Sequence, residues 1–157
     1  MDEIDATLLR ELQRDARQGH AELARRVGLS VTGVHKRLRR LEAHGLVRKT
    51  VALLDRQRLG LDLLCFLTAT FKSNTAPDNM ARLRDATAAL SEVLECYTLT
   101  GQADAVLKVT VRDHTHLRDF LARLSSAQDV LERIQTAIVL EEIKETNELP
   151  VAPPERP

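Results

Sequence analysis

The segment from Gly28 to Gly45 constrains the fold of this chain most, because both of its ends carry a helix-boundary signal. Ser30 can accept a hydrogen bond from the free backbone N–H groups of the turn that follows it. Gly45 can take the left-handed conformation that ends a helix. Three apolar residues between these ends recur with helical spacing: Val34, Leu38 and Leu41. The segment therefore predicts a helix with one apolar face.

The other faces of this helix are basic. They carry four cations against one acid, Glu42: Lys36, Arg37, Arg39 and Arg40. A solvated helix more often mixes Glu with Lys, because opposite charges four residues apart stabilise each other. The excess of cations indicates an anionic partner, and the phosphates of a nucleic acid fit this requirement.

Charge is unevenly distributed along the 157 residues, although the formal net charge is zero. Residues 1–60 hold 13 Lys and Arg against 8 Asp and Glu, so this part carries +5 and the remainder −5. This asymmetry is expected if the N-terminal part binds a polyanion and the C-terminal part stays away from it.

Location and redox state follow from what the sequence lacks. No apolar run approaches the ~20 residues that a helix needs to cross a bilayer. The first residues are acidic and lack the basic region with which a secretory signal begins. Cys65 and Cys96 are the only cysteines, both in apolar surroundings, so buried thiols are favoured over a disulfide. We expect a cytoplasmic protein without a membrane partner.

Two helices are predicted before the basic one, a first over residues 2–17 and a short second over residues 20–27, each with an apolar face. The short turn 28–30 then joins the second and third helices as in a helix-turn-helix. Residues 46–54 are β-compatible and predict a strand or small wing, and residues 55–60 a linker. We therefore assign residues 1–46 to a helix-turn-helix domain and 47–60 to the wing strand and linker.

From Leu61 onward, the pattern alternates between strands and helices. Strands are predicted over residues 61–71, 93–100, 105–111 and 130–143, with helices after Pro77 and Asp113. The order β-α-β-β-α-β is that of a ferredoxin-like domain, which we assign to residues 61–148. The Pro-rich residues 149–157 are predicted to be an irregular tail. The fold class is thus α+β.

Oligomerisation is expected from the sheet of this second domain. Residues 61–67 and 105–111 are apolar at nearly successive positions, so both faces of the sheet need cover. We expect a homodimer formed sheet to sheet.

An ordered set of residues resembles the Lrp/AsnC family of feast/famine transcriptional regulators, over nearly the whole chain. The set consists of Asp2, Asp5, Leu9, Leu12, Asp15, Arg17, Glu22-Leu23-Ala24, Gly28-Leu29-Ser30, Arg37, Arg40-Leu41-Glu42, Gly45, Asp55 and Leu59-Gly60. The turn from Gly101 to Asp104, before an apolar strand, looks like the family's effector-domain motif. That motif usually reads Gly-Asp-Tyr-Asp, and here Gln102 and Ala103 replace the acid and the aromatic residue.

The resemblance implies a winged helix-turn-helix that binds palindromic double-stranded DNA as a dimer. It also implies a ferredoxin-like regulatory domain whose dimers assemble into tetramers, octamers or larger rings. An amino acid or related small molecule would bind between dimers, with the glycine-rich turn contributing contacts. No cofactor is implied beyond this possible amino-acid effector.

The DNA-binding candidates divide by role. The N-terminal part of a recognition helix faces base edges, which makes four residues candidates for base contacts: Thr32, Gly33, His35 and Lys36. Six residues are candidates for phosphate contacts: Ser30, Arg37, Arg39, Arg40, Arg48 and Lys49. An alternative for Arg37 is an ion pair with an acid inside the small domain.

The effector candidates centre on the turn between the second and third predicted strands. Asp104 suits the ammonium group of an amino acid, and the backbone N–H groups around Gly101 suit its carboxylate. The further candidates are Gln102, Thr98, Thr100 and Thr136. The alternative is a plain hairpin turn, in which Gly and Asp are common.

Other function classes find less support. A metal sensor built from His114, His116, Cys65 and Cys96 fits no common ligand spacing. An enzyme is not expected, since the sequence has no nucleophile–base motif or phosphate-binding loop. RNA binding would need sheet aromatics within a basic motif, and the chain offers Phe66, Phe71, Tyr97 and Phe120 without one. A DNA-organising protein that needs no ligand stays open as the alternative.

Overall fold

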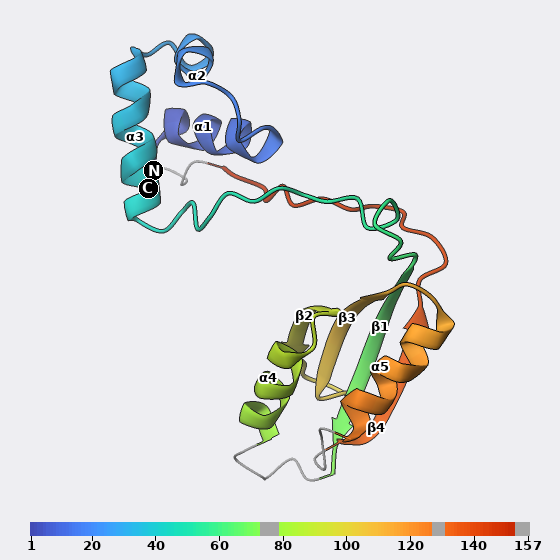
Figure 1. The fold of residues 1–157 in the computed structure, drawn as a ribbon. Helices are drawn as coiled ribbons and strands as arrows, with labels where there is room; N and C mark the ends of the chain where they lie inside the picture. Colours follow the sequence, from blue (N-terminus) through green and yellow to red (C-terminus); the bar gives the residue numbers. More distant parts are fainter. Residues whose placement is uncertain (73–78, 127–130, 153–157) are drawn as a thin grey trace. The chain divides into compact units, whose positions relative to one another are not determined.

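The computed structural model of the chain describes residues 1–72, 79–126 and 131–152. It contains two compact units. The first, here called the helical unit, comprises Met1–Leu53 together with the tail from Lys144 onward. The second, the sheet unit, comprises Leu54–Ile143 (Figure 1). The chain thus enters the helical unit twice, once from each end.

Three helices form the helical unit: α1 (Glu3–Arg14), α2 (His20–Val27) and α3 (Val31–Ala43). At the start of α1, the Asp2 carboxylate accepts the Asp5 N–H at 2.8 Å, and the Asp5 carboxylate accepts the Asp2 N–H at 3.1 Å. This reciprocal capping box satisfies two backbone donors of the first turn. Gly45 follows α3 with φ 72°, which confirms the predicted left-handed end of this helix.

The apolar faces of the three helices meet in one small core. Its buried members are Leu8, Leu9, Leu23, Ala24, Val34, Leu38 and Leu41. Full burial of one such leucine stabilises the fold by about 1.5–3 kcal/mol. Since α3 contributes Val34, Leu38 and Leu41 to this core, its opposite face points to solvent. The predicted helix-turn-helix arrangement is confirmed.

The strand predicted for residues 46–54 does not form, so the prediction of a wing was wrong. Residues 46–62 contain no strand, and the side chains of Leu46, Val51, Leu53 and Leu54 are all more than half exposed. A β-strand needs a hydrogen-bonded neighbour, and the described part of the helical unit contains no strand to pair with. The β-compatible composition of this segment is not enough on its own.

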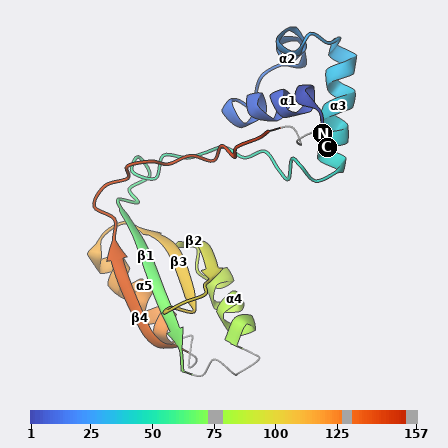
Figure 2. The same ribbon diagram turned by 180° about the vertical axis from the view of Figure 1, so that it is seen from behind.

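The described part of the sheet unit has the order β-α-β-β-α-β, as predicted. Its elements are β1 (Leu63–Phe71), α4 (Asn79–Ala89), β2 (Val93–Thr98), β3 (Ala105–Val111), α5 (His114–Ser126) and β4 (Leu131–Ile138). The four strands form an antiparallel sheet in the spatial order β2-β3-β1-β4. Both helices cover the same face of this sheet, as the two opposite views show (Figures 1 and 2).

Alternate residues of the two central strands form the core beneath these helices. Cys65 pairs with Val109, and Leu67 pairs with Leu107, and all four are buried. Phe120 of α5 is also fully buried in this cluster. The helix-covered face is thus a continuous apolar layer between the sheet and α5.

The opposite face of the sheet is mixed in character. The register places Phe66 opposite Lys108 and Tyr97 opposite Val106 on this face. Phe66 is 42% exposed and Tyr97 is 56% exposed. Lys108 forms an ion pair with Glu95, in which Nζ lies 3.3 Å from Oε1. This face is therefore less apolar than the sequence pattern indicated, and the sheet-to-sheet dimer stays a prediction.

The last strand is shorter than predicted. It ends at Ile138, which pairs with Cys65, and the Val139 N–H makes the last backbone bond, to Leu64 O at 2.9 Å. Because β1 begins at Leu63, residues beyond Val139 have no neighbour in the sheet. The predicted strand start at Val130 and the predicted helix start at Pro77 lie outside the described residues.

None of the helices in the described ranges is long and apolar enough to pass through a membrane.

Candidate DNA-binding interface and effector site

The cap of α3 explains two of the predicted DNA-binding residues. Ser30 Oγ accepts the Gly33 N–H at 3.1 Å, so Ser30 begins the helix as predicted. A β-carbon at position 33 would stand 3.2 Å from Ser30 Oγ and 3.7 Å from the Leu29 side chain. Glycine at this position therefore leaves room for the capping oxygen. Ser30 and Gly33 have a structural role at the start of α3, beside any contact with DNA.

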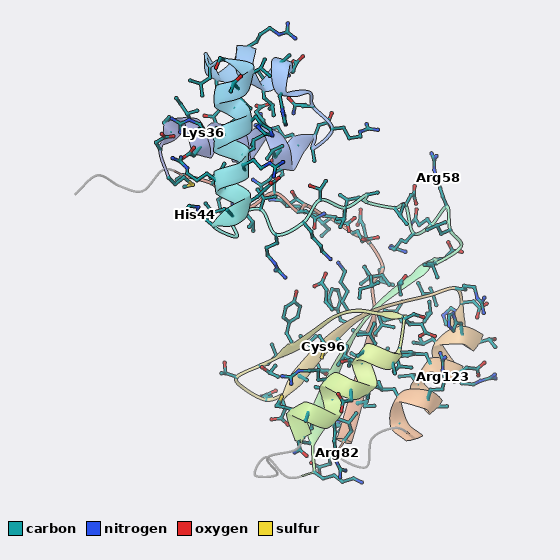
Figure 3. All side chains as sticks on the ribbon, turned by 60° about the vertical axis from the view of Figure 1, so that its left-hand side comes forward. Lys36, His44, Arg58, Arg82, Cys96 and Arg123 are labelled. Atoms are coloured by element: carbon teal, nitrogen blue, oxygen red, sulfur yellow. The ribbon has the colours of Figure 1, made fainter. Side chains whose placement is uncertain are left out.

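The outward face of α3 carries a row of exposed polar and basic side chains. They lie opposite the buried apolar face, at successive helical turns: Thr32, His35, Lys36 and Arg39. Figure 3 shows Lys36 midway along α3 and His44 at its end. Arg48 and Lys49 are exposed in the segment that follows the helix. We define Thr32, His35, Lys36 and Arg39 as the α3 outward face.

A second histidine adjoins this face. His20, the first residue of α2, lies beside His35 with the ring centroids 5.5 Å apart and the rings tilted by 47°. Both side chains are exposed. The sequence analysis missed His20, since no signal at residue 20 indicates that the start of α2 meets the second turn of α3.

Arg37 and Arg40 are occupied within the helical unit. Arg37 Nη1 contacts Asp2 Oδ2 at 2.6 Å and Asp5 Oδ1 at 2.8 Å, and Arg40 Nη2 contacts Asp5 Oδ2 at 2.7 Å. The alternative proposed for Arg37, an ion pair inside the small domain, is confirmed. These guanidinium groups hold α3 to the start of α1, and because the Arg40 side chain is still 53% exposed, the phosphate contacts of both residues stay predictions.

The Asp5 carboxylate is the centre of this pairing, with only 1% of the residue exposed. Burial alone would raise the pKa of Asp5, but hydrogen bonds from Arg37 and from the Asp2 backbone outweigh it and lower the pKa below its usual 3.8. The pKa of Asp2 is lowered too, chiefly by its bond to the Asp5 backbone and then by Arg37. Both groups are therefore charged at neutral pH.

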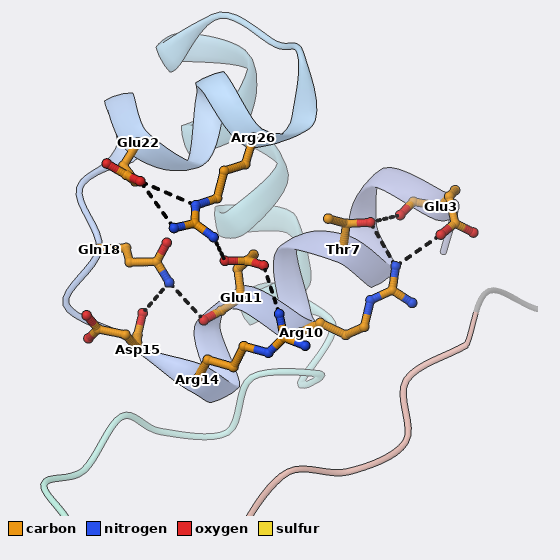
Figure 4. Close-up of polar contacts among 9 residues, drawn as sticks. All are labelled: Glu3, Thr7, Arg10, Glu11, Arg14, Asp15, Gln18, Glu22 and Arg26. Carbon is orange, nitrogen blue, oxygen red and sulfur yellow. Dashed lines mark hydrogen bonds and ion pairs between the residues drawn. The ribbon is translucent and has the colours of Figure 1, made fainter.

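Further charged contacts hold α1 against α2 (Figure 4). Arg26 reaches from α2 to the buried Glu11 carboxylate at 2.8 Å, and it also pairs with Glu22 at 3.2 Å. Gln18 Nε2 donates to the Glu11 and Asp15 backbone oxygens, both at 3.1 Å. Part of the positive charge of residues 1–60 is thus used inside the helical unit, and the cations of the α3 outward face stay accessible.

The predicted effector turn joins β2 to β3. Gly101 has φ 122°, a conformation that other residues rarely adopt, and the Leu99 N–H bonds to Asp104 O at 2.9 Å to close the hairpin. Asp104 has a structural role that the sequence analysis missed. Its Oδ2 accepts the Phe71 N–H at 2.8 Å, and its own N–H donates to Ala69 O at 2.9 Å. Asp104 therefore fixes the end of β1 against β3.

The other effector candidates divide into two groups. Thr98, Thr100 and Gln102 are exposed at the hairpin beside Gly101. Thr136 lies on β4, opposite Leu67 of β1, and β4 and β2 are the two edges of the sheet. Three strand spacings, about 14 Å, separate those edges. The fold thus brings the hairpin candidates together within one chain and leaves Thr136 apart from them.

The residues considered for a metal sensor do not form a ligand group in the described part of the chain. His116 Nε2 contacts Glu92 Oε1 at 2.9 Å, and its Nδ1 accepts the Arg112 N–H at 3.3 Å. Cys65 is a buried free thiol and Cys96 a half-buried one. Within residues 1–72, 79–126 and 131–152, no three His, Cys, Asp or Glu side chains are grouped as a metal site requires.

Comparison with protein families matches both units. Residues 1–42 match the AsnC-type helix-turn-helix domain, and residues 64–149 match the Lrp/AsnC ligand binding domain, which alone spans more than half of the chain. The chain belongs to the Lrp/AsnC family. It is therefore a transcriptional regulator with a DNA-binding helix-turn-helix domain and a ligand-binding domain, and not an enzyme.

Individual Lrp/AsnC proteins are similar over almost the full length. The leucine-responsive regulatory proteins of Escherichia coli K12 and Klebsiella pneumoniae are each 36% identical over 149 residues, covering 95% of this chain and 90% of theirs. A transcriptional regulator of Neisseria meningitidis, solved as a complex with L-Met, is 31% identical with a TM-score of 0.90, covering 96% of both chains. An AsnC family regulator of Agrobacterium tumefaciens is 32% identical with a TM-score of 0.90, covering 96% of this chain and 97% of its own.

Proposed function

We propose that this Lrp/AsnC regulator reads a specific DNA sequence with the α3 outward face and responds to an amino acid or a related small molecule. The observation that carries the first part is the exposure of Thr32, His35, Lys36 and Arg39 on one face of a capped helix whose other face is buried. An α-helix with such a face fits the major groove of DNA, where base edges are distinguishable.

Within this face, the residues have different roles. Thr32, His35 and Lys36 lie in the first two turns of α3 and contact base edges. Arg39 lies one turn further on and, with Arg48 and Lys49, contacts phosphates. Arg37 and Arg40 orient α3 through Asp5.

The test begins with selection of a preferred operator from random double-stranded DNA. Lys36→Ala is expected to relax the preference at one base position and to cost about 1–3 kcal/mol on the selected operator. Arg39→Ala is expected to weaken binding to all sequences alike and to reduce the salt dependence by about one counterion. Arg118→Ala removes an exposed cation of the sheet unit and serves as the control. Indistinguishable effects of Lys36→Ala and Arg39→Ala would contradict the division of roles.

The effector proposal is supported by relatives and by the hairpin. Two similar proteins are named leucine-responsive, and one similar structure contains L-Met. The hairpin at Gly101 exposes Thr98, Thr100 and Gln102 around a glycine with positive φ. These are polar groups that suit the carboxylate and ammonium groups of an amino acid.

The alternative is a DNA-organising protein of the same architecture that needs no ligand. Two observations favour it: Gln102 and Ala103 replace the acid and aromatic residue of the usual motif, and one Asp104 oxygen already binds the Phe71 N–H. Calorimetric titration with the common amino acids, leucine and methionine included, separates the two. Saturable binding that is weakened by Thr100→Ala supports the effector site, and no heat with any amino acid supports the alternative.

We also propose that the regulator works as a homodimer, with dimers associating further. Paired copies of α3 would reach successive major grooves of a palindromic operator. The apolar part of the open sheet face, Phe66 with Tyr97 and Val106, supports a dimer contact there. Sedimentation velocity of the full chain measures its oligomeric state.

A further inference from the structure

One surface of α1 holds a piece of the chain's own tail. Gln13 Nε2 donates to Leu149 O at 3.1 Å, and the Leu149 N–H donates to Gln13 Oε1 at 2.6 Å. A side-chain amide that binds the N–H and the C=O of one residue imitates a neighbouring β-strand. Gln13 therefore recognises extended backbone, whatever side chain residue 149 carries.

A second contact extends this recognition by one helical turn. Arg10 Nη1 donates to Val151 O at 3.2 Å. The guanidinium is oriented for this contact by Glu3, whose carboxylate lies 3.0 Å from Nη2, and by Thr7 Oγ1 at 2.9 Å (Figure 4). Arg10 and Gln13 lie about 4.5 Å apart along the helix, and alternate residues of an extended chain about 6.7 Å apart. The two spacings are close enough for both contacts to form together.

An apolar contact accompanies these hydrogen bonds. The Val151 side chain is half-buried and packs against the apolar core of the helical unit. The docked segment thus supplies one apolar anchor and three hydrogen bonds to its site on α1. A tail that only trailed through solvent would make neither kind of contact.

We propose that residues 149–151 are a strap, which docks on α1 of the same chain and ties the sheet unit to the helical unit a second time. The first connection follows Leu53, and the second enters at Lys144. While the strap is docked, both ends of the sheet unit are anchored to the helical unit, and release of the strap leaves one anchor. The strap stabilises the unit that carries α3 and restricts its freedom; its effect on operator binding rests on the proposed function.

Chemical cross-linking tests the docking directly in the full chain. Gln13→Cys combined with Leu149→Cys should be joined by a short bis-maleimide, which spans the distance that the Gln13 side chain now fills, into a cross-linked monomer that migrates faster than the untreated chain in denaturing electrophoresis. Each single cysteine variant serves as control for Cys65 and Cys96. A covalent dimer specific to the double variant would show that the tail comes from a second copy, and the absence of any cross-link would show that it does not dock. Either result overturns the proposal.

Truncation tests the consequence. A chain ending at Glu148 should melt about 4–8 °C lower in the helical unit and bind the selected operator about fivefold more weakly than the full chain. A chain ending at Ala152, which keeps the strap, should match the full chain. Equal melting of the two truncated chains would overturn the stabilising role. If the full chain bound no DNA, the proposed function would fail, while the cross-link and the melting temperature would still decide the strap.

Discussion

The ion pairs around Asp5 allow a quantitative prediction. Asp5 is buried on α1 and binds Arg37 at 2.8 Å and Arg40 at 2.7 Å, both from α3. Asp5→Asn keeps the shape of the side chain but removes its charge, and places an amide N–H₂ against two guanidinium groups that can only donate. The variant therefore breaks the polar contact between α1 and α3 and leaves the apolar core of the helical unit unchanged.

The size of the effect follows from burial. Removal of one partner from a fully buried ion pair costs about 3–5 kcal/mol. Here the arginine side chains are 25% and 53% exposed, and water can replace part of the lost interaction. We expect a loss of about 2 kcal/mol in the free energy of unfolding of the helical unit, below the range for a fully buried pair. For a unit of this size that loss corresponds to a melting temperature about 8–16 °C lower.

Calorimetry of the full chain at pH 7 measures this shift, with Glu42→Gln on the exposed side of α3 as control. Acid supplies an independent check. Because the pKa of Asp5 is lowered from 3.8, its contribution is complete above about pH 3.8 and declines as the pH falls further. The wild-type helical unit should therefore lose stability below pH 3.8 more steeply than Asp5→Asn. If the melting temperatures of Asp5→Asn and Glu42→Gln differed by less than about 2 °C, Asp5 would not hold α3 in place.

Three further predictions concern the sheet unit. Glu92 is buried against His116 and Arg123, and although burial raises its pKa, these contacts lower the pKa overall to about 2. Glu92→Gln should therefore lower the free energy of unfolding in urea at pH 7 by about 2 kcal/mol, and the wild type should lose this advantage as the pH falls from 4.5 toward 2. A stability difference that does not change with pH would refute this role of Glu92. Gly101→Ala should cost about 1–2 kcal/mol because of the φ of 122°, and an unchanged urea midpoint would show that the hairpin relaxes without strain. A fragment of residues 54–143 should self-associate in sedimentation velocity, and a monomer at all concentrations would refute dimerisation through the sheet.

Local chemistry was enough to predict the elements whose ends and faces are marked in the sequence. Ser30 and Gly45 mark the ends of α3, and the 3–4-residue spacing of Val34, Leu38 and Leu41 marks its buried face. The alternation of strand and helix patterns after Leu61 was sufficient to predict the sheet unit. These features depend on residues within a few positions of each other, and an amino-acid sequence displays such relations directly.

Pairing over long distances decided the rest. The segment 46–54 has the composition of a strand but lacks a neighbour in the helical unit, and β4 ends where β1 offers no further partner. Two partners were predicted for Arg37, a DNA phosphate or an acid of the small domain. The ion pair with Asp5 became evident only from the packing of α1 against α3. Composition does not reveal these outcomes, because each requires residues more than 30 positions apart.

The sequence by itself determined that this chain carries a basic, capped helix in a helix-turn-helix and a ferredoxin-like domain of the Lrp/AsnC type. The tertiary structure alone decided which of the basic residues pair with acids of the helical unit. Asp5 pairs with Arg37 and Arg40, and Arg26 pairs with Glu11 and Glu22. Lys36 and Arg39 lie on the exposed face of α3. The physical reason is that the attraction between opposite charges grows as they come closer, and the fold determines which charged side chains lie close together.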